Sequence, residues 1–278
     1  MNVLHTTLQN ALEQIQGVRP LLHCISNIVT ANDCANLALA IGASPIMAQE
    51  PQEMPQIAAL AKAVILNTGT PDEAKFQAAA IAGKTANQLH IPVILDPVGI
   101  GASTWRLNHI HDLLSQVHPD ILRVNLGEAK ALLGQTGTEH GVDSLESFRR
   151  TETDFYAREL ANALHTVVLL SGEEDLVTDG IRLKQISGGS PLTRSVTGAG
   201  CMLSVLCGAF ASIETTFLEA TPESASSQPD YYSSACLAAH FWKLCAETAA
   251  QTSSTPGSFR VGLFDAAYKL SIFNEKGI

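Results

Sequence analysis

The sequence predicts a three-layer α/β/α domain in which helices cover both faces of a mostly parallel central sheet. Short, uninterrupted apolar runs alternate with longer segments of helical periodicity, the pattern of buried parallel strands and their crossover helices. Hydrophobic residues make up 46% of the 278 residues and charged residues only 16%, which suits a sheet buried on both faces. Polar residues and glycines gather at the end of each apolar run.

Five apolar runs are the predicted parallel strands. They span residues 20–26, 63–67, 93–96, 120–125 and 166–171. Two further runs, residues 175–178 and 182–186, flank Asp179-Gly180, a dipeptide typical of a tight hairpin turn. We therefore expect an antiparallel hairpin to follow the last parallel strand.

Helical periodicity and helix-start signals mark the main helices. They are expected at residues 8–16, 31–41, 71–89, 198–212, 231–250 and 261–273. Gly42 is predicted to end the second helix, and Pro71 to open the third at its first position. Two stretches, 135–153 and 219–229, are predicted loops or insertions. Since there is no internal repeat and no linker-like stretch, residues 1–278 are predicted to form a single domain.

Composition excludes several classes of protein. The formal charge is −10, from 27 acidic and 17 basic residues, so nucleic acid is not expected as a partner. No apolar run reaches membrane-spanning length and the first residues lack a signal-peptide pattern, so we expect a cytoplasmic protein without a membrane partner. The six cysteines form no CxxC pair and the nine histidines no HExxH motif, which argues against a zinc or redox site.

The residues at the strand ends predict an active site along one edge of the sheet. They are Asn27, the segment Asn67-Thr68-Gly69, Asp96-Pro97, Asn125 and Ser171-Gly172. In open parallel sheets, ligands bind beyond the carboxyl ends of the strands. These side chains are therefore expected to meet at one place.

The turn Thr197-Gly198-Ala199-Gly200-Cys201 is the predicted anion site. Two glycines let the backbone bend sharply, and the apolar helix that follows turns its positive N-terminal end toward the same point. Such a device stabilises a phosphoryl group in transit. A GxG pattern is also found where a helix start needs glycine only for close packing, and Cys201 is either a contact to a substrate hydroxyl, with a pKa lowered by the helix end, or a buried filler.

Further candidates surround this turn. Asp96 ends a strand and is suited to holding Mg²⁺ through water or to capping a turn. The segment from Arg123 through Asn125 to Glu128 combines a cation for phosphate, an amide and a carboxylate, although Glu128 also suits a helix's first turn. Ser171 offers a hydroxyl at another strand end. No GxxxxGK[ST] motif is present, which argues against a Walker-type site.

Three residues frame the N-terminal part of the predicted site. Asn27 can hydrogen-bond a ring nitrogen or fix its own turn. Met47 can lie flat on an aromatic ring or fill the core, and Val29 lies on the same segment as Asn27.

Taken together and in order, these segments resemble the hydroxyethylthiazole kinase family of the ribokinase-like superfamily. The matching stretches are HCISNIVTANDCAN, GASPIMAQEPQEM, ILNTGT, ILDPVGIGAS, ILRVNLGEA, SGEEDLVTDG, SVTGAGCMLS and GSFRVGLFDAAYKL. The resemblance implies a Mg²⁺-dependent transfer of phosphate from ATP to the alcohol of 4-methyl-5-(2-hydroxyethyl)thiazole, in thiamin salvage. It also implies a homotrimer with active sites between subunits.

The resemblance assigns a role to each candidate. Thiazole would be bound by Asn27, Val29, Met47, Gly69 and Gly198. ATP would be bound by Arg123, Asn125 and Ser171, and the metal by Asp96 and Glu128. Catalysis would fall to Cys201 and the anion hole of Gly198, Ala199 and Gly200, with Cys201 standing where many related sugar kinases have Asp.

This chain departs from the family pattern in a few places. Ala199 stands where many members have a second Thr, Val124 and Leu126-Gly127 replace part of the usual Gly-Asn-Ala-Ser-Glu, and Ser171 replaces Thr. Two alternatives follow. One is another ribokinase-like enzyme, such as a hydroxymethylpyrimidine kinase or an NAD(P)H-hydrate dehydratase. The other is a non-catalytic relative that binds thiazole or nucleotide.

Overall fold

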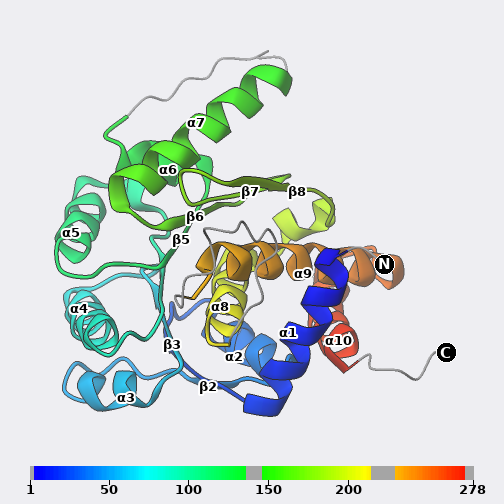
Figure 1. Cartoon of the computed structure of the whole chain (residues 1–278), viewed down its shortest axis with the longest axis horizontal. Helices are drawn as coiled ribbons and strands as arrows, with labels where there is room; N and C mark the ends of the chain where they lie inside the picture. Colours follow the sequence, from blue (N-terminus) through cyan, green and yellow to red (C-terminus); the bar gives the residue numbers. More distant parts are fainter. Residues whose placement is uncertain (1–2, 136–145, 214–228, 273–278) are drawn as a thin grey trace.

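The computed structural model describes residues 3–135, 146–213 and 229–272, and in this part of the chain it contains one eight-stranded sheet (Figure 1). The strand order is β2-β1-β3-β4-β5-β6-β7-β8, and β6-β7 and β7-β8 are the antiparallel pairs. The strands are β1 (Leu21–Ile25), β2 (Ser44–Ile46), β3 (Ala63–Asn67), β4 (Val93–Asp96), β5 (Ile121–Val124), β6 (Val167–Leu170), β7 (Asp175–Thr178) and β8 (Leu183–Ile186).

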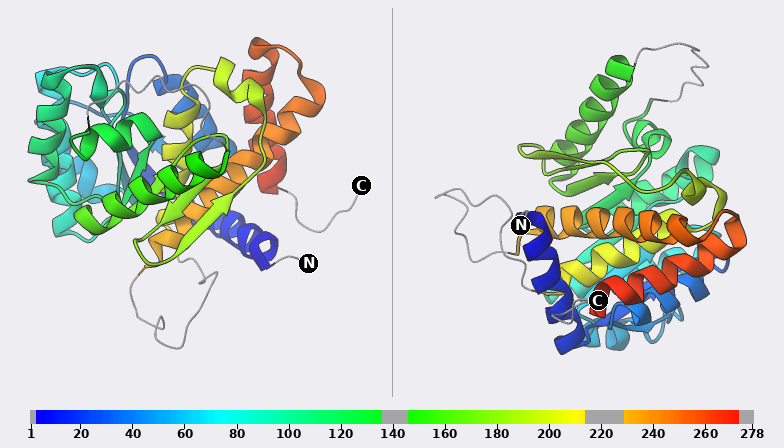
Figure 2. Two further views of the ribbon diagram at one scale, coloured as in Figure 1. Left: turned by 90° about the horizontal axis from the view of Figure 1, so that it is seen from above. Right: turned by 90° about the vertical axis from the view of Figure 1, so that its right-hand side faces the viewer.

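Helices cover both faces of this sheet. On one face lie α1 (Val3–Val18), α2 (Ala31–Ala40), α8 (Ala199–Ala211), α9 (Tyr231–Thr252) and α10 (Pro256–Ile272). On the other lie α3 (Met54–Leu60), α4 (Glu73–Gln88), α5 (Thr104–Leu114), α6 (Leu126–Leu132) and α7 (Glu146–Leu164). The further views in Figure 2 show α9 and α10 side by side, as their contacts require. The predicted three-layer α/β/α class is confirmed.

Side-chain alternation along the strands explains the uninterrupted apolar runs. Ile65 of β3 belongs to the core under α8 and α9, whereas its neighbours Val64 and Leu66 belong to the core under α4. Leu169 of β6 likewise faces the opposite way from Val168. Because both faces are covered, every position of such a strand can be apolar.

The predicted strands and the hairpin are confirmed, with Thr178 paired to Leu183 across the turn. Among the described elements, β2, α3, α5 and α6 lie outside the expected ranges. Of these, β2 has three residues and α3 seven, too few for a periodic signal. Pro71 was wrongly placed inside the third helix, because Asp72 is the N-cap and its side chain accepts a hydrogen bond from the Lys75 N–H.

The predicted loop at 135–153 is wrong in its second half, since α7 begins at Glu146. Its charged, weakly amphipathic sequence concealed the helix. Residues 136–145 and most of the predicted loop 219–229 lie outside the described residues. No described helix combines the length and the apolar character of a membrane span.

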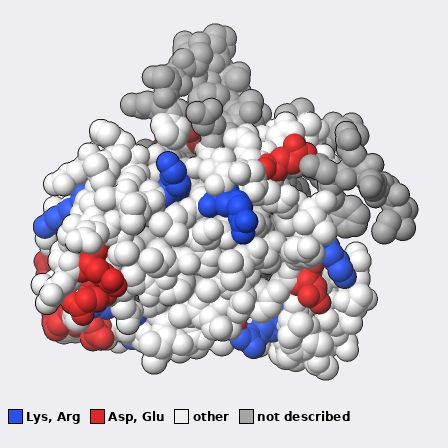
Figure 3. Space-filling view, turned by 90° about the horizontal axis from the view of Figure 1, so that it is seen from below, with Lys and Arg blue, Asp and Glu red and all other residues white. Residues whose placement is uncertain are grey.

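Charged side chains are scattered over the surface drawn in Figure 3, where Lys and Arg alternate with acidic and uncharged residues. Backbone phosphates of nucleic acids are bound by a continuous basic stripe or patch. The described residues on that face do not build one.

The sheet has a switch point between β1 and β3. From β1 the chain passes through α2 to β2 on one side, whereas from β3 it passes through α4 to β4 on the other. In such sheets, the crevice beyond the carboxyl ends of these two strands is the preferred ligand site. Asn27 follows β1 and Asn67 ends β3, so the topology brings two predicted site residues to this crevice.

Candidate active site

The turn that opens α8 has a shape only glycine allows. Gly198 is the helix N-cap, with a φ of +82°, in the left-handed region that side chains disfavour. A Cβ on Gly198 would also overlap the Thr30 methyl group, which belongs to the turn after β1. The helix behind the turn is buried along nearly its whole length. Its positive N-terminal end therefore lies beside the turn after β1, at the switch-point crevice.

Gly200 allows a second close approach. A Cβ at this position would overlap the guanidinium of Arg123, which lies directly against the turn. The Arg123 side chain comes from β5 and donates to Ser171 Oγ at 2.6 Å and to Asp96 Oδ1 at 3.3 Å. A fixed cation beside a helix N-terminus is suited to a phosphate group.

The Asp96 carboxylate fixes Arg123 and the start of α8 through hydrogen bonds. It is completely buried and accepts hydrogen bonds from Asn67 Nδ2 at 2.7 Å and Ser204 Oγ at 2.8 Å, besides the Arg123 pair. Ser204 belongs to α8, so the carboxylate ties β3, β5 and α8 together. Both of its oxygens are therefore engaged within the protein.

Glu128 and Asn125 form a capping box at the start of α6. Asn125 Oδ1 accepts from the Glu128 N–H, and Glu128 Oε2 accepts from the Asn125 N–H, both at 2.9 Å. Glu128 Oε1 also accepts from the Gly99 N–H at 2.9 Å. Burial raises the pKa of Glu128, although Arg123 and these N–H groups oppose the shift. The structure thus gives Glu128 a capping role, and its metal role stays a prediction.

The side of the turn that faces β1 and β3 is a closed polar network. It is the acceptor side, where the family resemblance places the phosphate-accepting alcohol. Asn27 is 3% exposed, and its Nδ2 donates to Asn67 Oδ1 at 3.0 Å and to Cys201 Sγ at 3.4 Å. Its Oδ1 accepts from the N–H groups of Val29 and Thr30, so the side chain fixes its own turn. Gly69 packs against Asn27 so closely that a Cβ there would lie 2.9 Å from Asn27 Nδ2.

The remaining predicted residues of this side are less enclosed. Val29 is 57% exposed and its neighbour Ile28 is 80% exposed. Met47, just after β2, is partly buried against the core under α1 and α2. Two exposed apolar side chains therefore stand directly beside the buried Asn27.

The sequence left two interpretations of Cys201 open, and the structure does not support the lowered pKa that one of them required. Burial raises the pKa of this thiol, and the nearby charge of Asp96 raises it further, against the smaller effects of Thr30, Asn67 and Arg123. Burial is the largest of these effects, and sequence alone does not reveal it.

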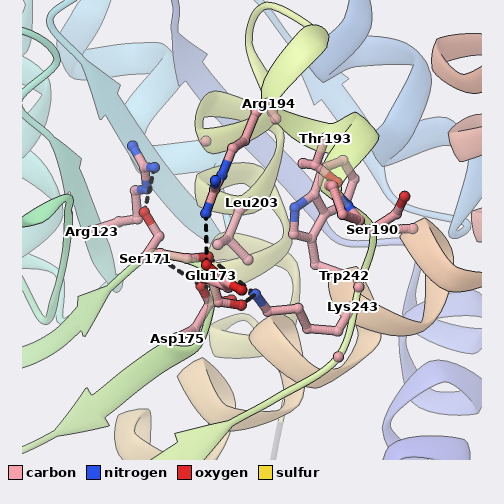
Figure 4. A pocket seen from close by; sticks show the side chains of 17 residues that line it. Arg123, Ser171, Glu173, Asp175, Ser190, Thr193, Arg194, Leu203, Trp242 and Lys243 are labelled. Carbon is pink, nitrogen blue, oxygen red and sulfur yellow. Dashed lines mark hydrogen bonds and ion pairs between the residues drawn. The ribbon is translucent and has the colours of Figure 1, made fainter. Parts of the chain in front are cut away.

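A cavity of about 400 Å³ opens on the other side of the turn (Figure 4). It lies between the end of β6, the 3-10 helix η2 (Pro191–Ser195), α8 and α9. Five predicted residues line it: Arg123, Ser171, Gly172, Ala199 and Gly200. Among the lining residues that the sequence did not suggest are Asp175, Arg194, Trp242 and Lys243.

The cavity carries three cations, and each is paired with a carboxylate. Arg123 pairs with Asp96, Lys243 Nζ lies 3.3 Å from Asp175 Oδ1, and Arg194 Nη2 lies 3.1 Å from Glu173 Oε2. Figure 4 shows Arg194 reaching toward Glu173 and Lys243 reaching toward Asp175 from two different walls. A cavity with three cations matches an anion with several charges, such as a nucleotide polyphosphate.

Lys243 also shapes the cavity wall. Its ammonium donates to the backbone carbonyls of Gly172 at 3.2 Å and Glu173 at 2.8 Å. The only sequence signal for it is a lysine in the middle of an otherwise apolar helix segment, FWKLC. Such a lysine must either reach the surface or find buried acceptors, and here it finds the latter.

Comparisons with known proteins agree on one family. The model of the hydroxyethylthiazole kinase family matches residues 12–273. A hydroxyethylthiazole kinase from Methanocella arvoryzae is 38% identical over 265 residues, covering 95% of this chain and 94% of the relative. The solved structure of the hydroxyethylthiazole kinase protein from Pyrococcus horikoshii has a TM-score of 0.82 and 34% identity, covering 95% and 93% of the two chains.

A more distant solved structure shares the fold alone. It is a ribokinase-like superfamily protein from Enterococcus faecalis, with a TM-score of 0.62 and 11% identity over 94% of each chain. The predicted ribokinase-like architecture is confirmed.

Proposed function

This chain belongs to the hydroxyethylthiazole kinase family, and from that premise we propose that it transfers the γ-phosphate of ATP to the alcohol of 4-methyl-5-(2-hydroxyethyl)thiazole. One observation carries the proposal: the turn Gly198–Cys201 stands between the cationic cavity and the Asn27 network. Ala199 and Gly200 line the cavity, while Cys201 accepts a hydrogen bond from Asn27. A phosphoryl group passing from one side to the other meets the N-terminus of α8 on its way.

The protein's part in this reaction is positioning and charge stabilisation. Arg123, with Ser171 at its side, would bind ATP phosphates, and Asn125 lies at the same sheet edge. The backbone N–H groups of Gly198, Ala199 and Gly200 would receive the charge on the transferred group. Asn27, Val29, Met47 and Gly69 would line the thiazole side.

The metal is expected to be Mg²⁺, which neutralises phosphate charge when bound. Asp96 and Glu128 would hold it through water, because each of their carboxylate oxygens already accepts a hydrogen bond from the protein. This fits an ion that keeps several waters and takes most of its other ligands from substrate phosphates.

Cys201 would chiefly place the alcohol, because burial and the charge of Asp96 raise the pKa of its thiol and so disfavour a thiolate base. We expect Cys201→Ser to lower kcat less than Asp96→Asn does. Steady-state kinetics of both variants test this, and an equal loss in the two would contradict the positioning role.

The reaction itself is tested by ADP release coupled to a second enzyme, with the thiazole alcohol and MgATP as substrates. Hydroxymethylpyrimidine is the matched alternative acceptor. ADP formed only with the thiazole supports the proposal. Thiazole binding seen by calorimetry, without any ADP, would instead favour a protein that binds thiazole but does not catalyse the transfer. Ala199, which replaces the second Thr of many members, motivates this alternative.

We further propose a cytoplasmic homotrimer whose sites lie between subunits. The exposed Ile28 and Val29, beside a buried Asn27, support a second subunit that covers this side. Light scattering of the protein in solution tests the assembly, and Val29→Asp is expected to weaken both assembly and thiazole binding. A monomer with full activity would contradict it.

A further inference from the structure

Lys75 occupies an unusual place for a lysine. It lies in the first turn of α4 and is 5% exposed, although its neighbours Glu73 and Ala74 face solvent. Burying an ammonium group is unfavourable unless its donors are satisfied. The Lys75 ammonium must therefore find hydrogen-bond acceptors inside the protein.

The ammonium bridges two loops at the carboxyl edge of the sheet. Nζ donates to the carbonyl of Ser26 at 2.9 Å and to the carbonyl of Gly69 at 2.8 Å, and it lies 3.4 Å from Thr70 Oγ1. Ser26 follows β1, whereas Gly69 and Thr70 follow β3. One side chain thus joins the two sides of the switch-point crevice.

The loop after β3 is strained where Lys75 grips it. Thr70 has a φ of +46°, in the left-handed region that a β-branched residue rarely enters. Lys75 Nζ binds the carbonyl of Gly69, just before Thr70, and contacts the Thr70 hydroxyl. That hydroxyl also accepts a hydrogen bond from the Ile28 N–H at 3.3 Å. These contacts hold the strained backbone in place.

The two bonded carbonyls belong to peptide groups that border the acceptor side. Since the described peptide bonds are all trans, the N–H groups of Asn27 and Thr70 point away from the ammonium. The Ser26–Asn27 peptide carries the Asn27 side chain that reaches Cys201 and Asn67. Turning either peptide would displace the wall against which the alcohol is expected to lie.

We propose that Lys75 is a positioning residue for the acceptor, which fixes the Asn27 and Gly69–Thr70 walls of the alcohol site without touching the alcohol. This rests on the proposed function for the identity of the acceptor. The nucleotide cavity lies on the other side of the α8 turn, and Lys75 has no part in its lining. The effect of Lys75 should therefore fall on one substrate only.

The first experiment replaces the ammonium by an apolar side chain of similar length, Lys75→Met. We expect the KM for the thiazole alcohol to rise about tenfold, the worth of one charged hydrogen bond, while the KM for ATP and kcat change less than about twofold. Lys84→Met, an exposed lysine of the same helix, is the matched control and should change neither KM. Equal changes in both KM values, or none, would overturn the proposal.

A second measurement needs no substrate. Hydrogen exchange in the ligand-free protein should be faster in Lys75→Met at residues 26–30 and 68–71, and unchanged around the cavity at residues 172–175. Unchanged exchange at the two loops would overturn the role of Lys75. Absence of kinase activity in the wild-type protein would instead overturn the proposed function and leave this result standing.

A double variant keeps the proposal testable if Lys75→Met alone does not fold. Thr70→Gly removes the strain, so Thr70→Gly with Lys75→Met is expected to fold even if Lys75→Met alone does not. Relative to Thr70→Gly, the double variant should still show a raised KM for the alcohol, because the Asn27 peptide is released. A KM equal to that of Thr70→Gly would contradict the proposal.

Discussion

The two sides of the α8 turn are built in opposite ways. On the nucleotide side, loops and helix faces surround an open cavity with three cations. On the acceptor side, Asn27, Asn67 and Asp96 are buried in a continuous hydrogen-bonded network. Under the proposed function, the cavity would hold the larger substrate, ATP, and the buried network would form a wall for the smaller one. That difference is what sites shared between subunits would require.

The largest effect is expected where the two sides meet. Gly200→Ala places a Cβ into the Arg123 guanidinium and must move it away from the turn. Loss of one charge-stabilising group typically lowers kcat by about 100-fold or more, and we expect a loss of that order. Steady-state kinetics measure it.

Gly257→Ala is the control, since a Cβ there meets nothing within 4 Å. A Gly200→Ala enzyme with near-normal kcat would show that the closeness of Arg123 to the turn is unimportant. Contact between Arg123 and the turn would then not contribute to phosphate transfer between the two sides.

A smaller effect, confined to the nucleotide side, is expected from Lys243→Met. It removes a cavity cation and the donor that holds the Gly172 and Glu173 carbonyls. We expect the KM for ATP to rise about tenfold, with the KM for the alcohol nearly unchanged. Lys269→Met, at an exposed position of α10, serves as the control. A rise in both KM values would contradict the expectation that Lys243 acts on the nucleotide side alone.

Acid is expected to destabilise the fold through His23, which joins β1 to the segment after β2. This fully buried histidine of β1 bonds the carbonyl of Ala48, and burial lowers its pKa below the ordinary 6.5, against smaller opposing effects of Ala48 and Glu53. The folded state then binds fewer protons than the unfolded state. Its contribution to stability is full above about pH 6.5 and declines as the pH falls below that value.

His23→Gln is therefore expected to flatten the decline of Tm between pH 7 and pH 5. Thermal unfolding across this range measures it, with the exposed His111→Gln as control. An unchanged slope in His23→Gln would mean that other groups set the acid sensitivity.

The smallest effect is expected from Arg194→Ala at the cavity mouth. The Arg194–Glu173 pair is 72% and 85% exposed, and such surface pairs contribute about 0–1 kcal/mol. We expect Tm to change by less than about 2 °C and the KM for ATP to rise about two- to threefold at low salt. The rise should vanish at about 1 M salt; a salt-independent change would point to a direct, enclosed contact instead.

Sequence reasoning predicted the strands well because residues buried on both faces leave uninterrupted apolar runs. It also predicted that the strand-end residues meet, since parallel strands end at one edge, and Asn27, Asn67 and Asp96 do meet there. Their individual site roles remain predictions.

The cavity wall could not be predicted in the same way. Trp242 and Lys243 lie in a helix whose cavity-facing positions have the same apolar spacing as core positions. Lys75 was equally hidden, because a lysine in an Ala-rich helix is ordinarily exposed. The pKa of Cys201 depends on burial and on the distance to Asp96, which only the folded chain determines.

The antiparallel hairpin has a consequence for how the cavity keeps its width. β7 begins, and β8 ends, at the active edge of the sheet, so the segments before and after the hairpin form two walls of the cavity. These walls are the two ends of one ribbon, and the β7–β8 pairing sets the spacing between them. The turn around Gly180 is the far tip of that ribbon, so a bulky label attached to the 87%-exposed Ile181 would report on the ribbon's motion without entering the site.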